Sequence, residues 1–195
     1  MARLDDDALD LMFRHARTHR YWSDEPVTET ILREAWELAK MGPTSANCSP
    51  MRVVFVVSGH AKQRLKPHLI DGNVRQTMAA PATAIVAYDM EFHEHMIRLW
   101  PREDARAWFA GKETLIKTTA LRNGSLQGAY LIMALRALGL DCGPMSGFSA
   151  KGVDEEFFAG TTWRSNFLCN IGHGDPSHLH PRNDRFQFDE ACRIL

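Results

Sequence analysis

Apolar side chains recur at helical spacing near the start of the chain. Leu9, Met12, Phe13 and Ala16 fall on one face of a helix, which predicts an amphipathic helix over residues 5–17. Acidic residues occupy its first turn and arginines its last, as the helix dipole favours. The first predicted element is therefore a helix with one buried face.

A second helix is predicted to begin at Thr28 and to end at the helix-breaking pair Gly42-Pro43. Thr28 can cap the first turn, while Val27 and Leu32 can pack against each other across it. The buried face is expected to consist of Ile31, Leu32, Ala35, Trp36, Leu38 and Ala39.

Three short apolar runs predict strands. Residues 51–58 contain a continuous run of valines and phenylalanine, which is typical of a strand covered on both faces, and residues 82–88 and 167–171 repeat that character. Helical stretches are predicted around 61–69 and 74–80, with a long, mainly helical region over 103–138. The predicted fold class is α+β, with a central sheet packed by helices.

The chain shows no internal repeat, low-complexity tract or Gly/Ser linker, so residues 1–195 are expected to form a single domain. The polar tail over 172–185 lacks apolar periodicity and is predicted to be irregular. A segment of that kind has to be held by something, such as a ligand or a second subunit.

The charge is balanced, because 23 basic and 24 acidic residues give a formal net charge of −1. That balance argues against a nucleic-acid partner and favours a small molecule. The N-terminus is acidic without an apolar run, and the most apolar stretch, 126–140, is shorter than the ~20 residues that span a bilayer. No membrane association is therefore expected. Four cysteines without a Cys-x-x-Cys pair favour free thiols and a cytoplasmic location.

Arginines near the two ends of the chain are candidates for binding an anion. Arg17 and Arg20 flank Thr18 where the first helix closes, and Arg182 and Arg185 lie three residues apart in the tail. Together they could form a phosphate pocket if the fold brings the ends together. Alternatively, the first pair is a solvated helix end.

Residues 42–50 place small polar side chains between two prolines, directly before a predicted strand. Thr44, Ser45 and Asn47 could offer hydroxyl and amide groups to a flat heteroaromatic ring, and Pro43 would stiffen the approach. An ordinary tight loop remains the alternative. Residues 139–148 contain three glycines that would let the backbone come close to a ligand, with Pro144 beside them.

Other catalytic and metal motifs are not matched. Gly143 lies three residues before Ser146, which excludes the Gly-x-Ser-x-Gly nucleophile elbow of hydrolases. The sequence at 172–174 begins like a dinucleotide fingerprint but lacks the third glycine and the following helix. The paired histidines at 93–95 and 178–180 lack the spacing of a metal site, so no metal is expected.

Taken in order, these motifs resemble those of the nitroreductase family of flavoproteins over essentially the whole chain. Each motif alone is weak, whereas the ordered set is specific. The resemblance implies a nitroreductase-like fold with a mainly antiparallel sheet and an obligate-type homodimer with FMN at the subunit interface. It also implies ping-pong hydride transfer through flavin N5, with NADH or NADPH as the reductant.

The resemblance assigns the cofactor's phosphate end to residues from both ends of the chain. Arg17, Thr18 and Arg20 correspond to the stretch that binds the phosphate and ribityl region, and the last of them reaches the ring. Arg182 and Arg185 are the candidates for the C-terminal cations. Because Ala16 stands where family members often carry a further arginine, these residues must carry more of the phosphate charge.

The resemblance assigns the ring end to three other segments. The loop 43–47 contacts the cofactor, Asn73 and Gln76 address the pyrimidine edge, and residues 144–147 lie over the ring near N5. The expected contacts are Pro43, Thr44, Ser45, Asn47, Asn73, Gln76, Pro144, Met145, Ser146 and Gly147.

Two departures from the family pattern affect this ring environment. Gln76 is neutral where many relatives have lysine, and Ser146 replaces an acidic residue. No side chain is a compelling general acid, and Ser146 is only a weak candidate near N5. A buried structural serine is an equal alternative, with the proton supplied by water or by the ribityl chain.

Within the family, four stretches look most like the malonic semialdehyde reductase branch of bacterial pyrimidine degradation. They are residues 42–50, 143–148, 170–175 and 188–192. That branch reduces malonic semialdehyde to 3-hydroxypropionate. The alternatives are a broad-specificity NAD(P)H nitroreductase or quinone reductase, a non-catalytic flavin-binding module, and a cofactor-free structural dimer.

Overall fold

The structure is a computed structural model that describes residues 3–195. Its centre is a sheet of four strands: β1 (Met51–Val56), β2 (Ala82–Asp89), β3 (Asp141–Met145) and β4 (Trp163–Gly172). The strand order is β1-β2-β4-β3, and every neighbouring pair is antiparallel. The predicted α+β class and antiparallel sheet are confirmed.

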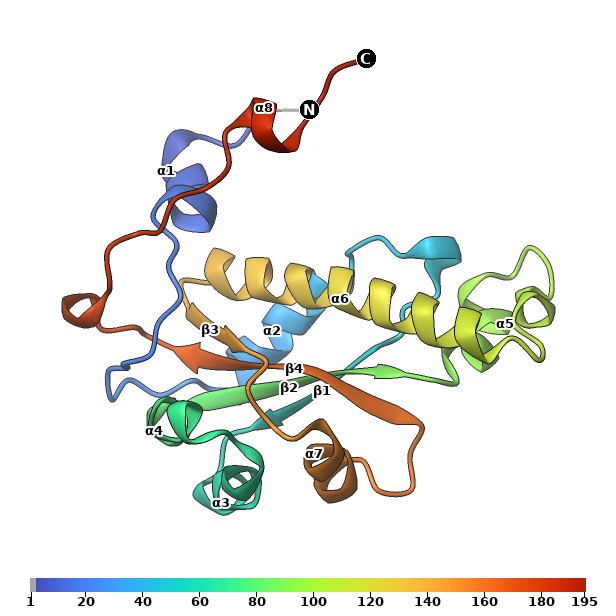
Figure 1. The fold of residues 1–195 in the computed structure, drawn as a ribbon, viewed down its shortest axis with the longest axis horizontal. Helices are drawn as coiled ribbons and strands as arrows, with labels where there is room; N and C mark the ends of the chain where they lie inside the picture. Colours follow the sequence, from blue (N-terminus) through green and yellow to red (C-terminus); the bar gives the residue numbers. More distant parts are fainter. Residues whose placement is uncertain (1–2) are drawn as a thin grey trace.

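Helices cover both faces of this sheet (Figure 1). One face carries α2 (Glu29–Ala39) and the long helix α6 (Glu113–Ala137). The other face carries α3 (Gly59–Leu65), α4 (Asp71–Ala79) and α7 (Ala150–Phe157). Every residue of β2 is buried, with Ala82, Ala84 and Val86 in one apolar core and Ile85 and Ala87 in the core on the other face.

Helix α2 begins as predicted, because Thr28 Oγ1 accepts a hydrogen bond from the Ile31 amide at 3.3 Å. Leu32, Ala35 and Ala39 are buried. The prediction for Leu38 is wrong: its side chain is 47% exposed, because it lies on the solvent side of the helix.

The N-terminal helix differs from the prediction. Instead of one helix over 5–17, α1 (Asp6–Leu9) passes into a π-helical turn over Asp10–Arg14. The wider turn changes the helical phase, and Leu11 and Phe13 are 48% and 56% exposed. At the other end of the chain, the tail passes the N-terminal segment before it forms α8 (Phe188–Ala191), and α1 and α8 both project from the body (Figure 1).

Two elements were not predicted, and one helix starts later than expected. Strand β3 lacks the β-branched residues that mark strands, and it is held by pairing along one edge with β4. Helix α7 is short and was likewise missed. The region before α6 forms the short helix α5 (Met96–Leu99) and single turns, and Gly111, at φ 69°, precedes the start of α6.

The tail beyond β4 is irregular, as predicted, apart from a turn at Pro176–His178. It runs back along the N-terminal segment, where the Asp175 amide donates to the Tyr21 carbonyl at 3.0 Å. No helix among residues 3–195 has both the length and the hydropathy needed to cross a bilayer. All four cysteines are free thiols, and Cys192 alone is exposed.

Candidate functional site

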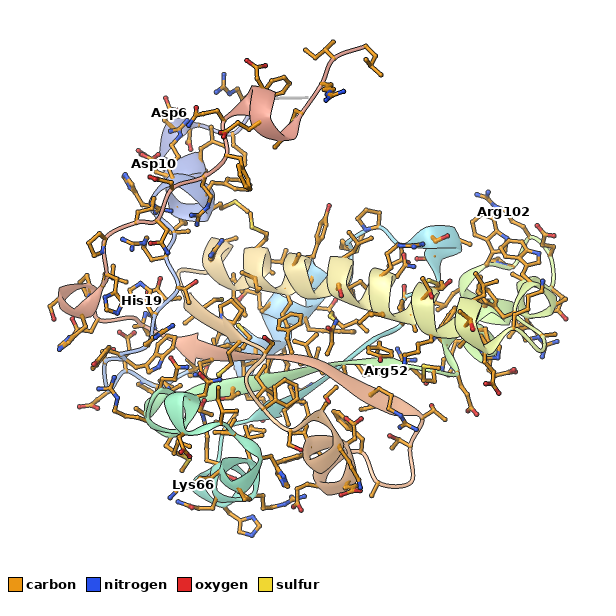
Figure 2. The ribbon with its side chains drawn as sticks, in the orientation of Figure 1. Asp6, Asp10, His19, Arg52, Lys66 and Arg102 are labelled. Atoms are coloured by element: carbon orange, nitrogen blue, oxygen red, sulfur yellow. The ribbon has the colours of Figure 1, made fainter. Side chains whose placement is uncertain are left out.

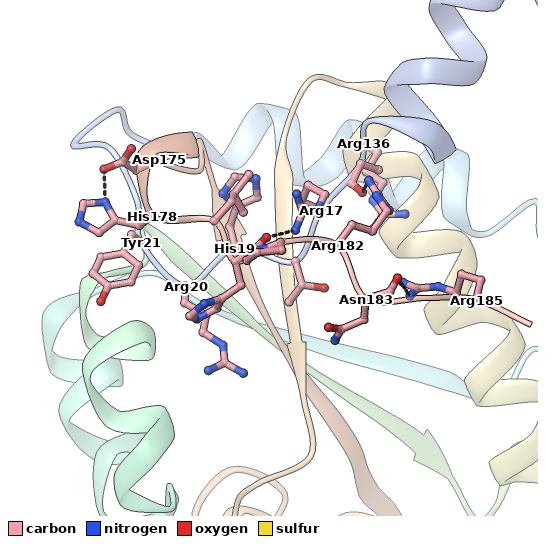
Figure 3. Close-up of a pocket in the computed structure, with 15 residues that line it drawn as sticks. Arg17, His19, Arg20, Tyr21, Arg136, Asp175, His178, Arg182, Asn183 and Arg185 are labelled. Carbon is pink, nitrogen blue, oxygen red and sulfur yellow. Dashed lines mark hydrogen bonds and ion pairs between the residues drawn. The ribbon is translucent and has the colours of Figure 1, made fainter.

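Arginines from both ends of the chain line one cavity of about 260 Å³, here called the arginine cavity (Figure 3). The structure therefore brings together the two arginine pairs that the sequence singled out, and Thr18 lines the same cavity. The arginines of this cavity are Arg17, Arg20, Arg136, Arg182 and Arg185.

The N-terminal wall of the cavity is held by the edge of the sheet. Thr18 forms a parallel bridge with Cys142 of β3, and the His19 amide donates to the Cys142 carbonyl at 3.1 Å. A Cβ atom on Gly143 would lie 2.5 Å from the His19 carbonyl oxygen. Gly143 therefore makes room for another segment of this protein, where the sequence suggested room for a ligand.

The C-terminal wall is tied to the N-terminal wall by guanidinium groups. Arg182 Nη2 donates to the carbonyls of Arg14 and Ala16 at 2.8 and 3.0 Å. Arg17 Nη2 donates to the His180 carbonyl at 2.5 Å. Each segment thus supplies arginines that hold the other one in place.

The cavity carries an excess of positive charge. None of its five arginines forms an ion pair with a carboxylate within residues 3–195. Asp175 also lines the cavity, but hydrogen bonds from Ser177, together with one from His178, lower the pKa of its carboxyl group to about 2 and occupy its oxygens. The cavity is suited to a multiply charged anion.

Arg136 was not predicted to belong to the site. It lies in the last turn of α6, and its Nε atom is buried without a hydrogen-bond partner. An unpaired buried donor is costly unless a bound group satisfies it. The available signal was a lone arginine within the apolar stretch 126–140.

A second group of predicted residues meets at the start of α4, and we call it the amide cluster. Asn73 Nδ2 donates to the Gly147 carbonyl at 2.9 Å, and Gln76 Nε2 donates to Asn73 Oδ1 at 2.6 Å. Gln76 also reaches Met145 Sδ at 3.7 Å. The two segments assigned to the ring are therefore neighbours.

Aromatic residues connect the arginine cavity to the amide cluster. Trp22 Nε1 donates to the Gln76 carbonyl at 3.1 Å. The Arg75 guanidinium lies 4.1 Å from the centroid of the Tyr21 ring, which stacks on His178 at 4.2 Å. The N-terminal segment thus lies against α4, and the cavity and the amide cluster form one continuous region.

Pro144 and Ser146 are both exposed. The Ser146 hydroxyl forms no hydrogen bond within the part of the chain that the structure describes. The alternative of a buried structural serine is wrong, and this hydroxyl is accessible to a bound molecule.

The loop over 42–50 is strained. Ala46, Asn47 and Ser49 all have positive φ angles, at 47°, 52° and 39°. Non-glycine residues adopt this conformation at a cost, and such strain is concentrated at functional sites. The loop therefore has a shape that an ordinary connection does not need.

The strained loop lies against the middle of α6, away from the arginine cavity. The Ser45 amide donates to Asn123 Oδ1 at 2.9 Å, and Asn47 Nδ2 donates to the Leu99 carbonyl at 3.0 Å. Thr44 Oγ1 accepts from the Ser49 amide, within the loop. Pro43, Thr44, Ser45 and Asn47 do not line the arginine cavity, so one protomer does not unite all the predicted contacts.

Comparison with known proteins gives one consistent result. The model of the nitroreductase family matches residues 13–173. A protein of Burkholderia lata, provisionally named an NADH dehydrogenase/NAD(P)H nitroreductase, is 61% identical over 100% of both chains. A Ralstonia nicotianae protein with the same provisional name is 51% identical, again over 100% of both.

Solved structures show the same fold at low sequence identity. A nitroreductase-like protein of Exiguobacterium sibiricum, crystallised in complex with FMN, superposes with a TM-score of 0.85 at 19% identity, covering 100% of both chains. A protein of Bacillus subtilis superposes with a TM-score of 0.87 at 19% identity, covering 98% of this chain and 100% of the other.

Proposed function

The chain belongs to the nitroreductase family, and from that premise we propose that it is an FMN-dependent NAD(P)H oxidoreductase. The observation that carries the proposal is the arginine cavity, where five guanidinium groups lack a carboxylate partner and the buried Arg136 Nε lacks any partner within residues 3–195. A phosphate dianion would satisfy both requirements.

The residues of the cavity fit the phosphate end of FMN. Arg17, Arg182 and Arg185 would hold the phosphate, and Arg136 would add a donor that the protein otherwise leaves unused. Arg20 extends from the same segment in a different direction from Arg17 and Arg182 (Figure 3), which suits it to the ring end.

The amide cluster fits the ring end. Asn73 is half-buried and Gln76 is buried. Their side-chain amides place hydrogen-bond donors and acceptors beside residues 145–147. When bound, FMN supplies the hydride chemistry, while the protein contributes orientation and electrostatics. The exposed hydroxyl of Ser146 could donate a proton to a substrate carbonyl, and water could do the same.

For the physiological reaction we propose the reduction of malonic semialdehyde to 3-hydroxypropionate. The support is the resemblance of residues 42–50, 143–148, 170–175 and 188–192 to that branch of the family. A broad-specificity nitroreductase or quinone reductase is the second candidate, because the Burkholderia and Ralstonia relatives carry nitroreductase names.

We further propose that the protein acts as a homodimer. The projecting terminal segments expose Phe13, Phe186 and Phe188, and α6 exposes Leu126 and Tyr130. Exposed apolar surface of this extent is typical of an interface. A partner whose strained loop reaches the arginine cavity would complete the set of predicted contacts.

A spectroscopic and kinetic panel tests the assignment. Purified protein should be yellow with an oxidised-flavin spectrum, and colourless protein that cannot be reconstituted with FMN would refute it. Oxidation of NADH and NADPH should be followed with malonic semialdehyde, a nitroaromatic and a quinone. Bound FMN with negligible turnover of every acceptor would indicate a flavin-binding module instead.

A further inference from the structure

Lys62 is a buried lysine on α3 that belongs to neither the arginine cavity nor the amide cluster. The residue is 4% exposed. Burial lowers the pKa of its ammonium group to about 7. Because lysine is almost never buried to this extent without a compensating environment, the groups around it call for an explanation.

The ammonium group is held by neutral oxygen atoms. Nζ donates to the Thr77 carbonyl of α4 at 2.8 Å and to Thr83 Oγ1 of β2 at 2.6 Å. No carboxylate forms an ion pair with it anywhere in residues 3–195. The Thr77 carbonyl lies towards the C-terminal end of α4, where the helix dipole is negative and favours a cation.

From Lys62 a chain of buried hydrogen bonds leads towards the candidate site. Thr83 Oγ1 donates to Asn170 Oδ1 at 2.7 Å, and Asn170 Nδ2 donates to Thr77 Oγ1 at 3.3 Å. Thr77 Oγ1 then contacts Met145 Sδ at 3.7 Å, the same sulfur atom that the amide cluster contacts. Lys62 is thus connected to the back of the amide cluster.

We propose that Lys62 is a positioning residue that fixes α4 against the sheet and places a positive charge behind the amide cluster, favouring electron uptake by bound FMN. The inference rests on the proposed function, because it requires FMN at that edge. Reduction adds negative charge to the pyrimidine side of the ring, and a cation shielded from water stabilises such charge more strongly than an exposed one. Asn73 and Gln76 are themselves neutral.

The competing role is purely structural, a polar tie between α3, α4 and the sheet. The unfolding temperature does not separate the two roles, because in both of them loss of Lys62 removes hydrogen bonds as well as the cost of a buried charge. Only the proposed role predicts a change in the flavin midpoint potential, so the potential is the discriminating measurement.

The test compares Lys62→Met with Lys66→Met in FMN-loaded protein. Methionine keeps most of the length of lysine without its charge. Lys66 is exposed, in the turn that follows α3, and serves as the matched control (Figure 2). Thr83→Val is the second variant if Lys62→Met does not fold, because it keeps the side-chain shape and removes one of the two oxygens that hold the ammonium group, which lowers the pKa of Lys62 further and favours the neutral amine. Midpoint potential is measured by spectroelectrochemistry at pH 6, where Lys62 is protonated because its pKa is about 7, and the unfolding temperature is measured alongside.

Lys62→Met, or Thr83→Val in its place, should shift the midpoint potential to more negative values, while Lys66→Met keeps the wild-type potential. An unchanged potential in a folded, FMN-loaded variant would overturn this inference and leave the proposed function standing. Failure of wild-type protein to bind FMN would overturn both.

Discussion

Unpaired positive charge is the residue-level feature that most restricts what this protein can bind. Arginine remains charged at any accessible pH, so five arginines around one cavity repel one another unless an anion is present. Their guanidinium groups use only part of their donor capacity on carbonyls such as that of His180. The remaining donors are available to an anion.

The double variant Arg17→Ala/Arg182→Ala tests that assignment. Each removed guanidinium would take away charge-assisted hydrogen bonds to phosphate, so FMN affinity should fall by at least about 100-fold. Quenching of flavin fluorescence on binding measures the change. Arg33→Ala, on the exposed side of α2, is the control and should retain FMN. Undiminished flavin retention in the double variant would show that the phosphate binds elsewhere.

The buried ammonium of Lys62 gives a prediction for stability. Its pKa is about 7 in the folded protein and near 10.5 in the unfolded chain, so the unfolded state binds more protons between these values. The cost of burying the charge is fully present below pH 7 and is relieved as pH rises. Between pH 7.0 and 8.5 the free energy of unfolding should therefore rise by roughly 1–2 kcal/mol on this account.

Urea denaturation of wild type and Lys62→Met across that interval measures the effect. The difference between the two proteins isolates Lys62, since both share every other titrating group. The interval also ends below the raised pKa of the buried Cys48 thiol, which is about 11 because of burial. Parallel pH profiles in the two proteins would contradict the prediction.

Site residues with distinctive chemistry are visible in the sequence, whereas those that belong to the site only through their position in the fold are not. Arg17, Arg20, Arg182 and Arg185 could be selected because clustered charge in polar segments is visible in a sequence. Arg136 could not, because only the fold shows that the end of α6 reaches the same cavity.

At the scale of elements, the edge strand β3 organises the site. Its outer edge receives the segment that carries Arg17 and Arg20, and its end carries Met145 beside the amide cluster. Gly143 is the position where the approach is tightest. Packing of this edge therefore controls the geometry of both the arginine cavity and the amide cluster.

Gly143→Ala should displace the N-terminal wall of the cavity. The new methyl group would lie 2.5 Å from the His19 carbonyl oxygen. That oxygen belongs to the backbone, which cannot move aside as the end of a flexible side chain can. We expect a loss of about 1–3 kcal/mol of stability, as for other overpacked sites, together with weaker FMN binding. Urea denaturation and a flavin titration measure the two effects.

Gly59→Ala is the matched control, because nothing lies within 4 Å of the position its Cβ would take. It should keep wild-type FMN affinity. Tight FMN binding by Gly143→Ala would show that the cavity does not depend on the close contact between β3 and the segment that carries Arg17.

The elements were predictable where their pattern is local. Strands β1 and β2 contain continuous apolar runs, and α2 has a capping residue and a clear stop. Strand β3 reads as a glycine-containing turn because its conformation is imposed by its partner β4. The π-helical turn after α1 likewise has no signature in the hydrophobic pattern.

At the scale of the whole molecule, the predicted contacts separate into two places. The arginine cavity and the amide cluster form one region, whereas the strained loop lies on the middle of α6. Which segments meet across a subunit interface cannot be read from one sequence, because no local pattern encodes it. A site shared between two protomers would explain why the loop over 42–50 is strained although it does not line the arginine cavity of its own protomer.

A subunit-complementation experiment tests the shared site. One variant is Arg17→Ala/Arg182→Ala, and the other is Ser45→Ala/Asn47→Gly, which removes polar groups from the loop while tolerating its positive φ. Each homodimer would then lack one half of every site. In a mixed dimer, the intact arginines of one protomer would face the intact loop of the other, which restores one site of the two.

Neither variant alone should bind FMN tightly. After random subunit exchange, half of the dimers are mixed, so binding should recover to roughly a quarter of the wild-type sites. Flavin content after gel filtration measures the recovery, and light scattering should give twice the chain mass. If the site lies within one protomer, mixing restores nothing, because each chain still carries its own defect. Recovery would therefore place the loop and the arginines in one site built by two chains.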